Sequence, residues 1–205
     1  MTFVYAILGQ KGGGGKTSTA YSLGTWHAQR GKLVFFGDTD LRQQCLTELL
    51  YCRTHKLDMT SIVADTYAGI TAAMPAGCDV LIIDGKPNAS DQTLLIAGRA
   101  DRIIIPCASS RTNLIASGNL ADQLIAKGIR ADRIFFAITP AASKAHAAKA
   151  VAALEQYGHK VAATLPFSPE FESALDDGRA LHEASNLHMR AAGQAYVAAL
   201  ISKHA

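Results

Sequence analysis

The segment Gly9–Thr19 carries the side chains with the clearest chemical potential. It reads Gly-Gln-Lys-Gly-Gly-Gly-Gly-Lys-Thr-Ser-Thr and follows the apolar run Val4–Leu8. Glycines have no Cβ atom, so successive backbone N–H groups can converge on an anion, and a helix N-terminus adds positive potential. A lysine and then a hydroxyl at the end of such a loop suit a phosphate chain and its Mg²⁺ ion. The predicted phosphate-binding residues are Gly12, Gly13, Gly14, Gly15, Lys16, Thr17 and Ser18.

Three aspartates follow two further apolar runs. Asp38 and Asp40 come after Leu33–Phe36, and Asp84 comes directly after Val80–Ile83. Ligands of α/β sheets bind at the carboxyl ends of the strands, so these acids are candidates to hold a metal ion. Each could also be an ordinary turn residue, because Asp is common after strands. The glycine loop nearby favours the metal-binding interpretation, with Thr17 as a ligand and Asp84 acting through a water molecule.

Short apolar runs alternate with segments of helical period along the whole chain. The runs are apolar on both faces, which is typical of strands buried in a parallel sheet. The alternation predicts an α/β fold, a doubly wound and mostly parallel sheet with flanking helices. The expected strands are Val4–Leu8, Leu33–Phe36, Val80–Ile83, Ile103–Ile105, Ile134–Ile138 and Val161–Leu165, and the expected helices are Lys16–Arg30, Gln43–His55, Ser90–Arg99, Leu114–Lys127, Lys144–Tyr157 and Ser185–Lys203.

Length and composition agree with one compact domain over residues 1–205. Hydrophobic residues make up 49% of the chain and charged residues 18%, which favours a buried core over disorder. The net charge of +3 is too small to indicate a polyanionic partner by itself. No apolar run reaches the roughly 18 residues that a membrane-spanning helix needs. The first residues do not read as a signal peptide, so we expect a cytoplasmic protein.

The loop departs from the common phosphate-loop pattern in an informative way. Gln10 stands where that pattern has its first glycine, and a second lysine, Lys11, precedes the glycines. The resulting Lys11-Gly-Gly-x-Gly-Lys-Thr resembles the deviant Walker A motif of the ParA/MinD family of ATPases. Asp38-Thr39-Asp40 resembles that family's switch I, Asp84 its Walker B aspartate, and Ile103–Pro106 its next strand. The resemblance covers about residues 1–125 with specific motifs and the remainder more loosely.

This resemblance implies a P-loop ATPase that uses ATP and Mg²⁺. It assigns catalytic roles to Lys11, Lys16, Asp38 and Asp40. Lys11 would cross a dimer interface to the phosphates held by the partner subunit, so that two ATP molecules are sandwiched between two chains. Asp40 would orient the attacking water and contribute to the metal site with Thr17 and Asp84, while Asp38 supports the metal shell. Slow, partner-stimulated hydrolysis is expected of such a switch.

Other positions are less informative. The resemblance implies adenine contacts from loops after the last strands, near Thr139-Pro140 and Pro166-Phe167-Ser168, although Phe167 can equally be a core or surface aromatic. Leu41-Arg42 replaces the family's usual Pro-Gln, Gly14 replaces a larger residue, and Lys86 follows the Walker B strand. These departures bear on the rate of hydrolysis more than on nucleotide binding.

The track of such a switch is DNA or a membrane. Six cations and two acids between positions 127 and 160 give a local charge of +4, which indicates either a solvated helix face or a surface for non-specific DNA binding. The tail Ala191–Ala205 has a single lysine, Lys203, and reads as a packed helix, so no membrane contact is expected. The predicted DNA contacts are Lys127, Arg130, Arg133, Lys144, Lys149 and Lys160.

The leading interpretation is a ParA-type switch for plasmid or chromosome segregation. It would form a homodimer on ATP, associate with the nucleoid, and be stimulated by a cargo-bound adaptor of the ParB kind. One alternative is a ParA-like positioning factor for a secretion, conjugation or cellulose-synthesis complex. Another is a P-loop metabolic ligase or kinase, which Lys11 disfavours.

Overall fold

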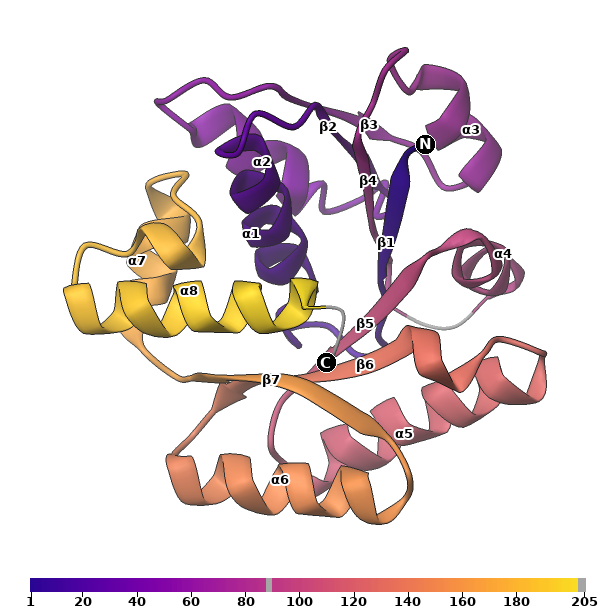
Figure 1. Cartoon of the computed structure of the whole chain (residues 1–205), viewed down its shortest axis with the longest axis vertical. Coiled ribbons are helices and arrows are strands. Elements are labelled where there is room, and N and C mark those ends of the chain that lie inside the picture. The colour runs from indigo at the N-terminus through magenta and orange to yellow at the C-terminus, as the bar shows by residue number, and fades with distance from the viewer. Residues whose placement is uncertain (88–89, 203–205) are drawn as a thin grey trace.

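A seven-stranded, all-parallel sheet forms the centre of the computed structural model, which describes residues 1–87 and 90–202. Its strand order is β3-β2-β4-β1-β5-β6-β7 (Figure 1). The strands are β1 (Phe3–Ile7), β2 (Val34–Asp38), β3 (Met59–Val63), β4 (Val80–Asp84), β5 (Arg102–Cys107), β6 (Ile134–Ala141) and β7 (Lys160–Pro166). The helices are α1 (Lys16–Ala28), α2 (Cys45–Cys52), α3 (Tyr67–Ala73), α4 (Asp91–Arg99), α5 (Arg111–Ala126), α6 (Lys144–Gln156), α7 (Pro169–Asp176) and α8 (Leu187–Ile201), with 3₁₀ turns η1 (Ala131–Arg133) and η2 (Leu181–Glu183).

Helices cover both faces of the sheet, so the strands are buried on two sides. Alternate residues of β1 show this: Tyr5 and Ile7 pack with α1, α2, α7 and α8, while Val4 and Ala6 pack with α3 to α6. Two apolar clusters result, one on each face. This arrangement explains why the strands read as continuous apolar runs, and it confirms the predicted α/β fold.

The six predicted strands are present in the structure. The sheet also contains a seventh strand, β3, that was not predicted. β3 was missed because it lies at the sheet edge and none of its five residues is fully buried. The helices α3 and α7 were also missed. α2 is shorter than the expected Gln43–His55, and α8 ends at Ile201. Lys203, the predicted end of that last helix, lies outside the described residues.

The sheet topology brings the predicted chemical residues to one edge. β4 lies between β1 and β2, and its last residue, Asp84, is in register with Ile7 on one side and Asp38 on the other. The loop Gly9–Gly15 continues from β1. Because parallel strands end at the same edge, the glycine loop and both aspartates become neighbours.

The C-terminal helix α8 is packed into the core, as predicted for the tail. Its residues Tyr196, Val197 and Leu200 are buried, and the Tyr196 hydroxyl lies 2.8 Å from Thr19 Oγ1 on α1. The buried Arg102 guanidinium donates to the carbonyls of Leu200 and Ser202 and so fixes the end of the helix. Within residues 1–87 and 90–202, no helix is long and apolar enough to cross a membrane.

Candidate functional site

The glycine loop has the backbone geometry that a phosphate cradle requires. Gly13 and Gly15 adopt left-handed φ angles of 72° and 77°, which side-chain-bearing residues rarely adopt. Gly15 stands immediately before α1, so the first amides of the helix face the loop. A Cβ atom at Gly14 would lie 3.3 Å from the Pro106 carbonyl oxygen, so a small residue allows the loop to approach β5.

Lys16 is folded inward beneath this loop. It is only 7% exposed, and its Nζ donates a 3.0 Å hydrogen bond to the carbonyl oxygen of Lys11. Burial lowers the pKa of the Lys16 ammonium, and the nearby Asp84 opposes that effect. The Lys11 residue itself is exposed to solvent. The two lysines of the motif are therefore linked through the backbone of the first, while the charge of Lys11 is directed to solvent.

Two buried carboxylates lie below the loop with unused hydrogen-bonding capacity. Asp84 Oδ2 accepts a 2.6 Å hydrogen bond from the Thr17 hydroxyl, whereas Asp84 Oδ1 and Asp38 Oδ2 have no hydrogen-bond partner within residues 1–87 and 90–202. Burial raises the pKa of Asp84 to about 7, and the Thr17 bond partly offsets this rise. Burial also raises the pKa of Asp38. Orphaned buried carboxylate oxygens beside a threonine hydroxyl are suited to Mg²⁺, which prefers oxygen ligands.

Asp40 shapes the turn between β2 and α2. Its backbone N–H donates to Asp38 Oδ1 at 3.0 Å, and its Oδ1 accepts hydrogen bonds from the backbone N–H groups of Arg42 and Gln43 at 3.1 Å. Gln44, which closes the turn, has the left-handed φ of 48°. The departure Leu41-Arg42 thus forms an exposed, tightly hydrogen-bonded turn that holds Asp40 at the mouth of the site.

A cavity of about 510 Å³ joins these groups. It is lined by most of the predicted residues: Gly12, Gly13, Gly15, Lys16, Thr17, Ser18, Asp38, Asp40 and Asp84. Lys11 and Gly14 belong to the same loop without lining the cavity. Pro166 and Phe167 do not line it either; both lie at the exposed end of β7, and Phe167 is 55% exposed.

The cavity has further walls that sequence reasoning missed. The turn between β2 and α2 and the helix α2 itself contribute Gln43, Cys45, Glu48 and Leu49. The segment after β4 contributes Gly85 and Pro87, and α7 contributes Leu175. Leu49 and Leu175 come from separate helices, α2 and α7. No local pattern links them, because α7 follows the last strand and reaches this edge only through tertiary packing.

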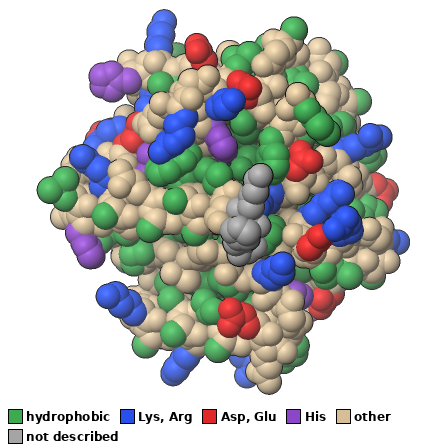
Figure 2. Space-filling view, viewed as in Figure 1, with side chains coloured by type: hydrophobic (Ala, Val, Ile, Leu, Met, Phe, Trp, Pro, Cys, Tyr) green, Lys and Arg blue, Asp and Glu red, His purple; other side chains and the backbone are tan. Residues whose placement is uncertain are grey.

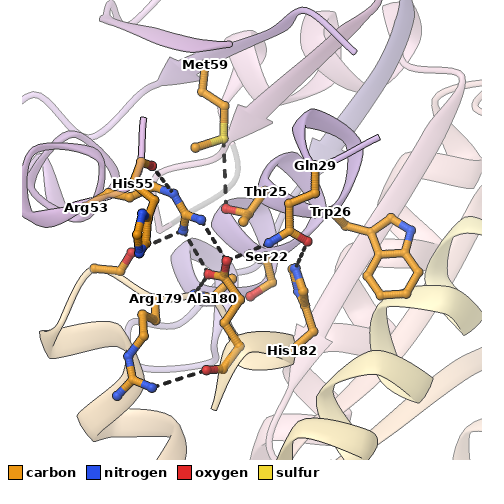
Figure 3. A network of polar contacts seen from close by, with 12 residues as sticks. Ser22, Thr25, Trp26, Gln29, Arg53, His55, Met59, Arg179, Ala180 and His182 are labelled. Atoms are coloured by element: carbon orange, nitrogen blue, oxygen red, sulfur yellow. Dashed lines mark hydrogen bonds and ion pairs between the residues drawn. The ribbon is translucent and has the colours of Figure 1, made fainter. Parts of the chain in front are cut away.

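A polar network fixes α2 against the C-terminal part of the chain (Figure 3). Arg53, at the end of α2, makes two hydrogen bonds of 2.7 and 2.8 Å to the Glu183 carboxylate of η2. Gln29, after α1, donates to Glu183 at 2.6 Å, and its amide oxygen lies 3.1 Å from His182 Nε2. The Arg53 side chain is almost fully buried. A bidentate, buried pair of this kind holds α2, which lines the cavity, in a fixed position against η2.

The structure divides the predicted basic surface into separate groups. Lys127, Arg130, Arg133 and Lys160 lie where α5 ends and where β6 and β7 begin, at the sheet edge opposite the cavity. Lys144 starts α6, which follows the carboxyl end of β6, and Lys149 lies within that helix. Arg130 pairs with Asp132. In the face shown by Figure 2, Lys and Arg side chains are dispersed among acidic ones.

The sequence matches the family described as the CobQ/CobB/MinD/ParA nucleotide binding domain over residues 5–181. The chain belongs to this family. It is a nucleotide-binding ATPase of the ParA/MinD group, with a P-loop at the edge of an all-parallel sheet. Among curated proteins, no sequence matches the chain closely enough to count as a relative.

Solved structures share the fold at low sequence identity. The ATP complex of an McdA variant from Cyanothece is 20% identical with a TM-score of 0.72, covering 97% of this chain and 96% of that one. The MinC:MinD complex from Aquifex aeolicus is 16% identical with a TM-score of 0.74, covering 97% and 94%. MinD with Mg-ADP from Pyrococcus horikoshii is 15% identical with a TM-score of 0.71, covering 98% and 95%. These likenesses extend over nearly the full chains.

Proposed function

We propose that this ATPase is a switch that dimerises on Mg²⁺–ATP and hydrolyses it slowly. The cavity supports a Mg²⁺-bound nucleoside phosphate, because it combines a glycine cradle, a buried ammonium and three carboxylates at one sheet edge. The fold neighbours from Cyanothece and Pyrococcus horikoshii bind ATP and Mg-ADP, respectively. Bound Mg²⁺ would neutralise the charge that develops on the phosphates during transfer.

The residues of the cavity that face the phosphates and the metal have distinct roles in this proposal. The loop amides of Gly12–Gly15 and the Lys16 ammonium hold the phosphates. Thr17 and Asp84 would hold Mg²⁺ and Asp38 would support the metal shell; among the described residues, Asp38 Oδ2 and Asp84 Oδ1 are buried without a hydrogen-bond partner. Asp40, placed at the cavity mouth by its turn, contributes to the metal site and orients the attacking water.

The dimer proposal depends on Lys11. Its side chain is exposed at the front of the loop and does not line its own chain's cavity. In that position the Lys11 ammonium can reach phosphates bound to a second copy of the chain more readily than phosphates bound in its own cavity. Its backbone carbonyl accepts the 3.0 Å hydrogen bond from Lys16 Nζ. When Lys16 turns to the phosphates, this bond breaks and the start of the loop is released.

Size-exclusion chromatography with ADP, ATP and a slowly hydrolysed analogue tests the dimer. The wild-type chain should dimerise with the analogue and remain monomeric with ADP. Lys11→Ala should bind nucleotide yet stay monomeric, and its hydrolysis should fall by about 10³-fold, as for loss of a cation supplied in trans. Lys56→Ala is the matched control, because Lys56 is exposed and outside the cavity. A Lys11→Ala chain that dimerises normally would contradict the proposal.

We further propose non-specific DNA as the track and DNA segregation as the role, with a cargo-bound adaptor as the stimulating partner. The large apolar residues of α8 that are buried, Tyr196, Val197 and Leu200, pack in the core rather than being presented to a membrane. The group formed by Lys127, Arg130, Arg133 and Lys160 lies opposite the nucleotide edge, so it would stay exposed in a sandwich dimer. Dimerisation would present it twice, which favours nucleoid association in the ATP state.

Retention of duplex DNA at increasing salt tests the track. The analogue-bound dimer should be retained on duplex DNA and should elute as salt is raised. The triple variant Lys127→Ala, Arg133→Ala, Lys160→Ala should elute at a far lower salt concentration than the double variant Lys144→Ala, Lys149→Ala. Absence of salt-sensitive retention would instead favour a positioning factor for a protein complex. A chain that keeps one size with every nucleotide and converts a small molecule would be a metabolic enzyme.

A further inference from the structure

Thr39, between the two switch aspartates, is buried and hydrogen-bonded in an unusual way. It is 3% exposed. Its hydroxyl donates to the carbonyl oxygen of Asp84 at 2.9 Å and accepts from the backbone N–H of Lys86 at 2.7 Å. Its own backbone N–H donates to the same Asp84 carbonyl at 3.1 Å. The residue therefore makes three hydrogen bonds to the end of the neighbouring strand β4.

The hydroxyl takes the place of a main-chain acceptor. In a regular parallel pairing of β2 and β4, the hydrogen bond from Thr39 N–H to the Asp84 carbonyl would be followed by one from Lys86 N–H to the Thr39 carbonyl. Here the side-chain oxygen receives that N–H instead. The main chain of β2 is thereby free to turn away, and Asp40 N–H bonds to Asp38 Oδ1. One side chain ends the ladder and permits the turn that carries Asp40.

The segment that Thr39 holds is also fixed on its other side. Gly85 N–H donates to the Ile7 carbonyl of β1 at 2.9 Å, and a Cβ atom at Gly85 would lie 2.8 Å from that oxygen. The residues after Asp84 are thus held between the end of β1, where the glycine loop begins, and the end of β2. Movement of this segment would be transmitted to both.

We propose that Thr39 is a positioning residue that holds Asp38 and Asp40 in register with Asp84 through its hydroxyl. It acts through these aspartates and does not itself touch nucleotide or metal. The inference rests on the proposed roles of Asp40 and Asp84, but its structural part is tested on protein to which no nucleotide has been added. Loss of the hydroxyl should loosen the switch turn relative to β4 and weaken Mg²⁺-dependent binding, while the glycine cradle is left unchanged.

The test compares Thr39→Val, which removes the hydroxyl, with Thr39→Ser, which keeps it. Amide hydrogen exchange of the nucleotide-free proteins should show the Lys86 N–H exchanging about tenfold faster in Thr39→Val, consistent with loss of one hydrogen bond, and near wild type in Thr39→Ser. Binding of a fluorescent ATP analogue should lose its Mg²⁺ enhancement in Thr39→Val and keep its Mg²⁺-free affinity. The kcat should fall at least tenfold, with rescue by serine. Thr60→Val, at an exposed strand position, is the matched control.

Several outcomes would overturn the proposal. Wild-type exchange at Lys86 in a folded Thr39→Val chain would show that the hydroxyl does not hold the segment. Faster exchange with unchanged Mg²⁺ dependence and kcat would show that the link has no functional effect. If Thr39→Val and Thr39→Ala both fail to fold while Thr39→Ser folds, the hydroxyl serves the fold alone. Because the exchange measurement needs no nucleotide, it separates failure here from failure of the proposed switch.

Discussion

Replacing Asp84 by asparagine should stabilise the metal-free protein, and by more at pH 8 than at pH 5. Asp84 is almost fully buried, and its folded pKa of about 7 lies well above its ordinary value of 3.8. Between those values the folded state binds a proton that the unfolded state releases, so wild-type stability falls as pH rises through this window. Asparagine has the same shape, keeps an acceptor for Thr17, and has no charge to bury.

The size of the effect follows from the shift. A difference of about 3 pKa units corresponds to about 4 kcal/mol at alkaline pH, using 1.36 kcal/mol per unit. Roughly 2.5 kcal/mol of that penalty develops between pH 5 and pH 8. For a chain of this length, 1 kcal/mol moves Tm by about 2–4 °C, so the Tm gap should widen by about 5–10 °C across this range.

Thermal unfolding without Mg²⁺ or nucleotide, at half-unit steps from pH 5 to pH 8, measures this gap. Asp65→Asn is the control, because Asp65 is exposed and outside the cavity. With Mg²⁺ and ADP added, the wild-type Tm should rise and that of Asp84→Asn should rise less, since the variant lacks the charged ligand. A gap between Asp84→Asn and wild type that does not change with pH would refute the assigned cost of burying this carboxylate.

Three further outcomes are expected. Lys16→Ala should lower ATP hydrolysis by about 100-fold or more, measured by phosphate release, through loss of a preorganised cation at the phosphates; hydrolysis at the wild-type rate would contradict this. Asp40→Ala should retain analogue-induced dimerisation by chromatography while hydrolysis falls by about 10²–10⁴-fold, and unchanged hydrolysis would exclude its water-orienting role. Burial lowers the pKa of His182 from 6.5 to about 4, so below pH 6.5 the unfolded state binds a proton that the folded state does not. The free energy of unfolding of the wild type, measured in urea, should therefore fall by about 3 kcal/mol relative to that of His182→Phe as pH drops from 7 to 4. Parallel pH profiles for those two chains would contradict the His182 prediction.

The sequence was sufficient to predict elements whose signals are local. The strands of the sheet interior are continuous apolar runs because helices cover both faces, and the glycine loop is contiguous in the chain. β3 was missed because its five residues are half-exposed and follow no clear apolar pattern. α7 was missed although Ser168 and Pro169 stand at its start as N-cap and first residue, with Glu170 in its first turn. Its eight residues were too few to show a helical period.

The site was predictable in part, for the same reason. Positions of aspartates at strand ends can be read along the chain, but the register between strands cannot. Only the structure pairs Asp38 with Asp84 across β2 and β4 and gives Thr39 its role between them. The expectation that Pro166 and Phe167 contact adenine came from the family resemblance and stays a prediction; neither residue lines the cavity, whose walls include Leu49 of α2 and Leu175 of α7. Packing between distant segments decides such contacts.

The register also brings two buried carboxylates together at this edge of the sheet. Asp38 and Asp84 are paired positions on adjacent strands, and like charges directly opposite each other destabilise a sheet. In the part of the chain that the structure describes, each keeps a buried oxygen without a hydrogen-bond partner, while Lys16, whose charge acts on Asp84, is bonded to a backbone carbonyl. In the proposed function these carboxylates would help to hold Mg²⁺, and a phosphate chain would draw the Lys16 ammonium away from the Lys11 carbonyl. Binding would therefore relieve unfavourable interactions that the fold holds in place, and the free energy released would be available to rearrange the loop that carries Lys11.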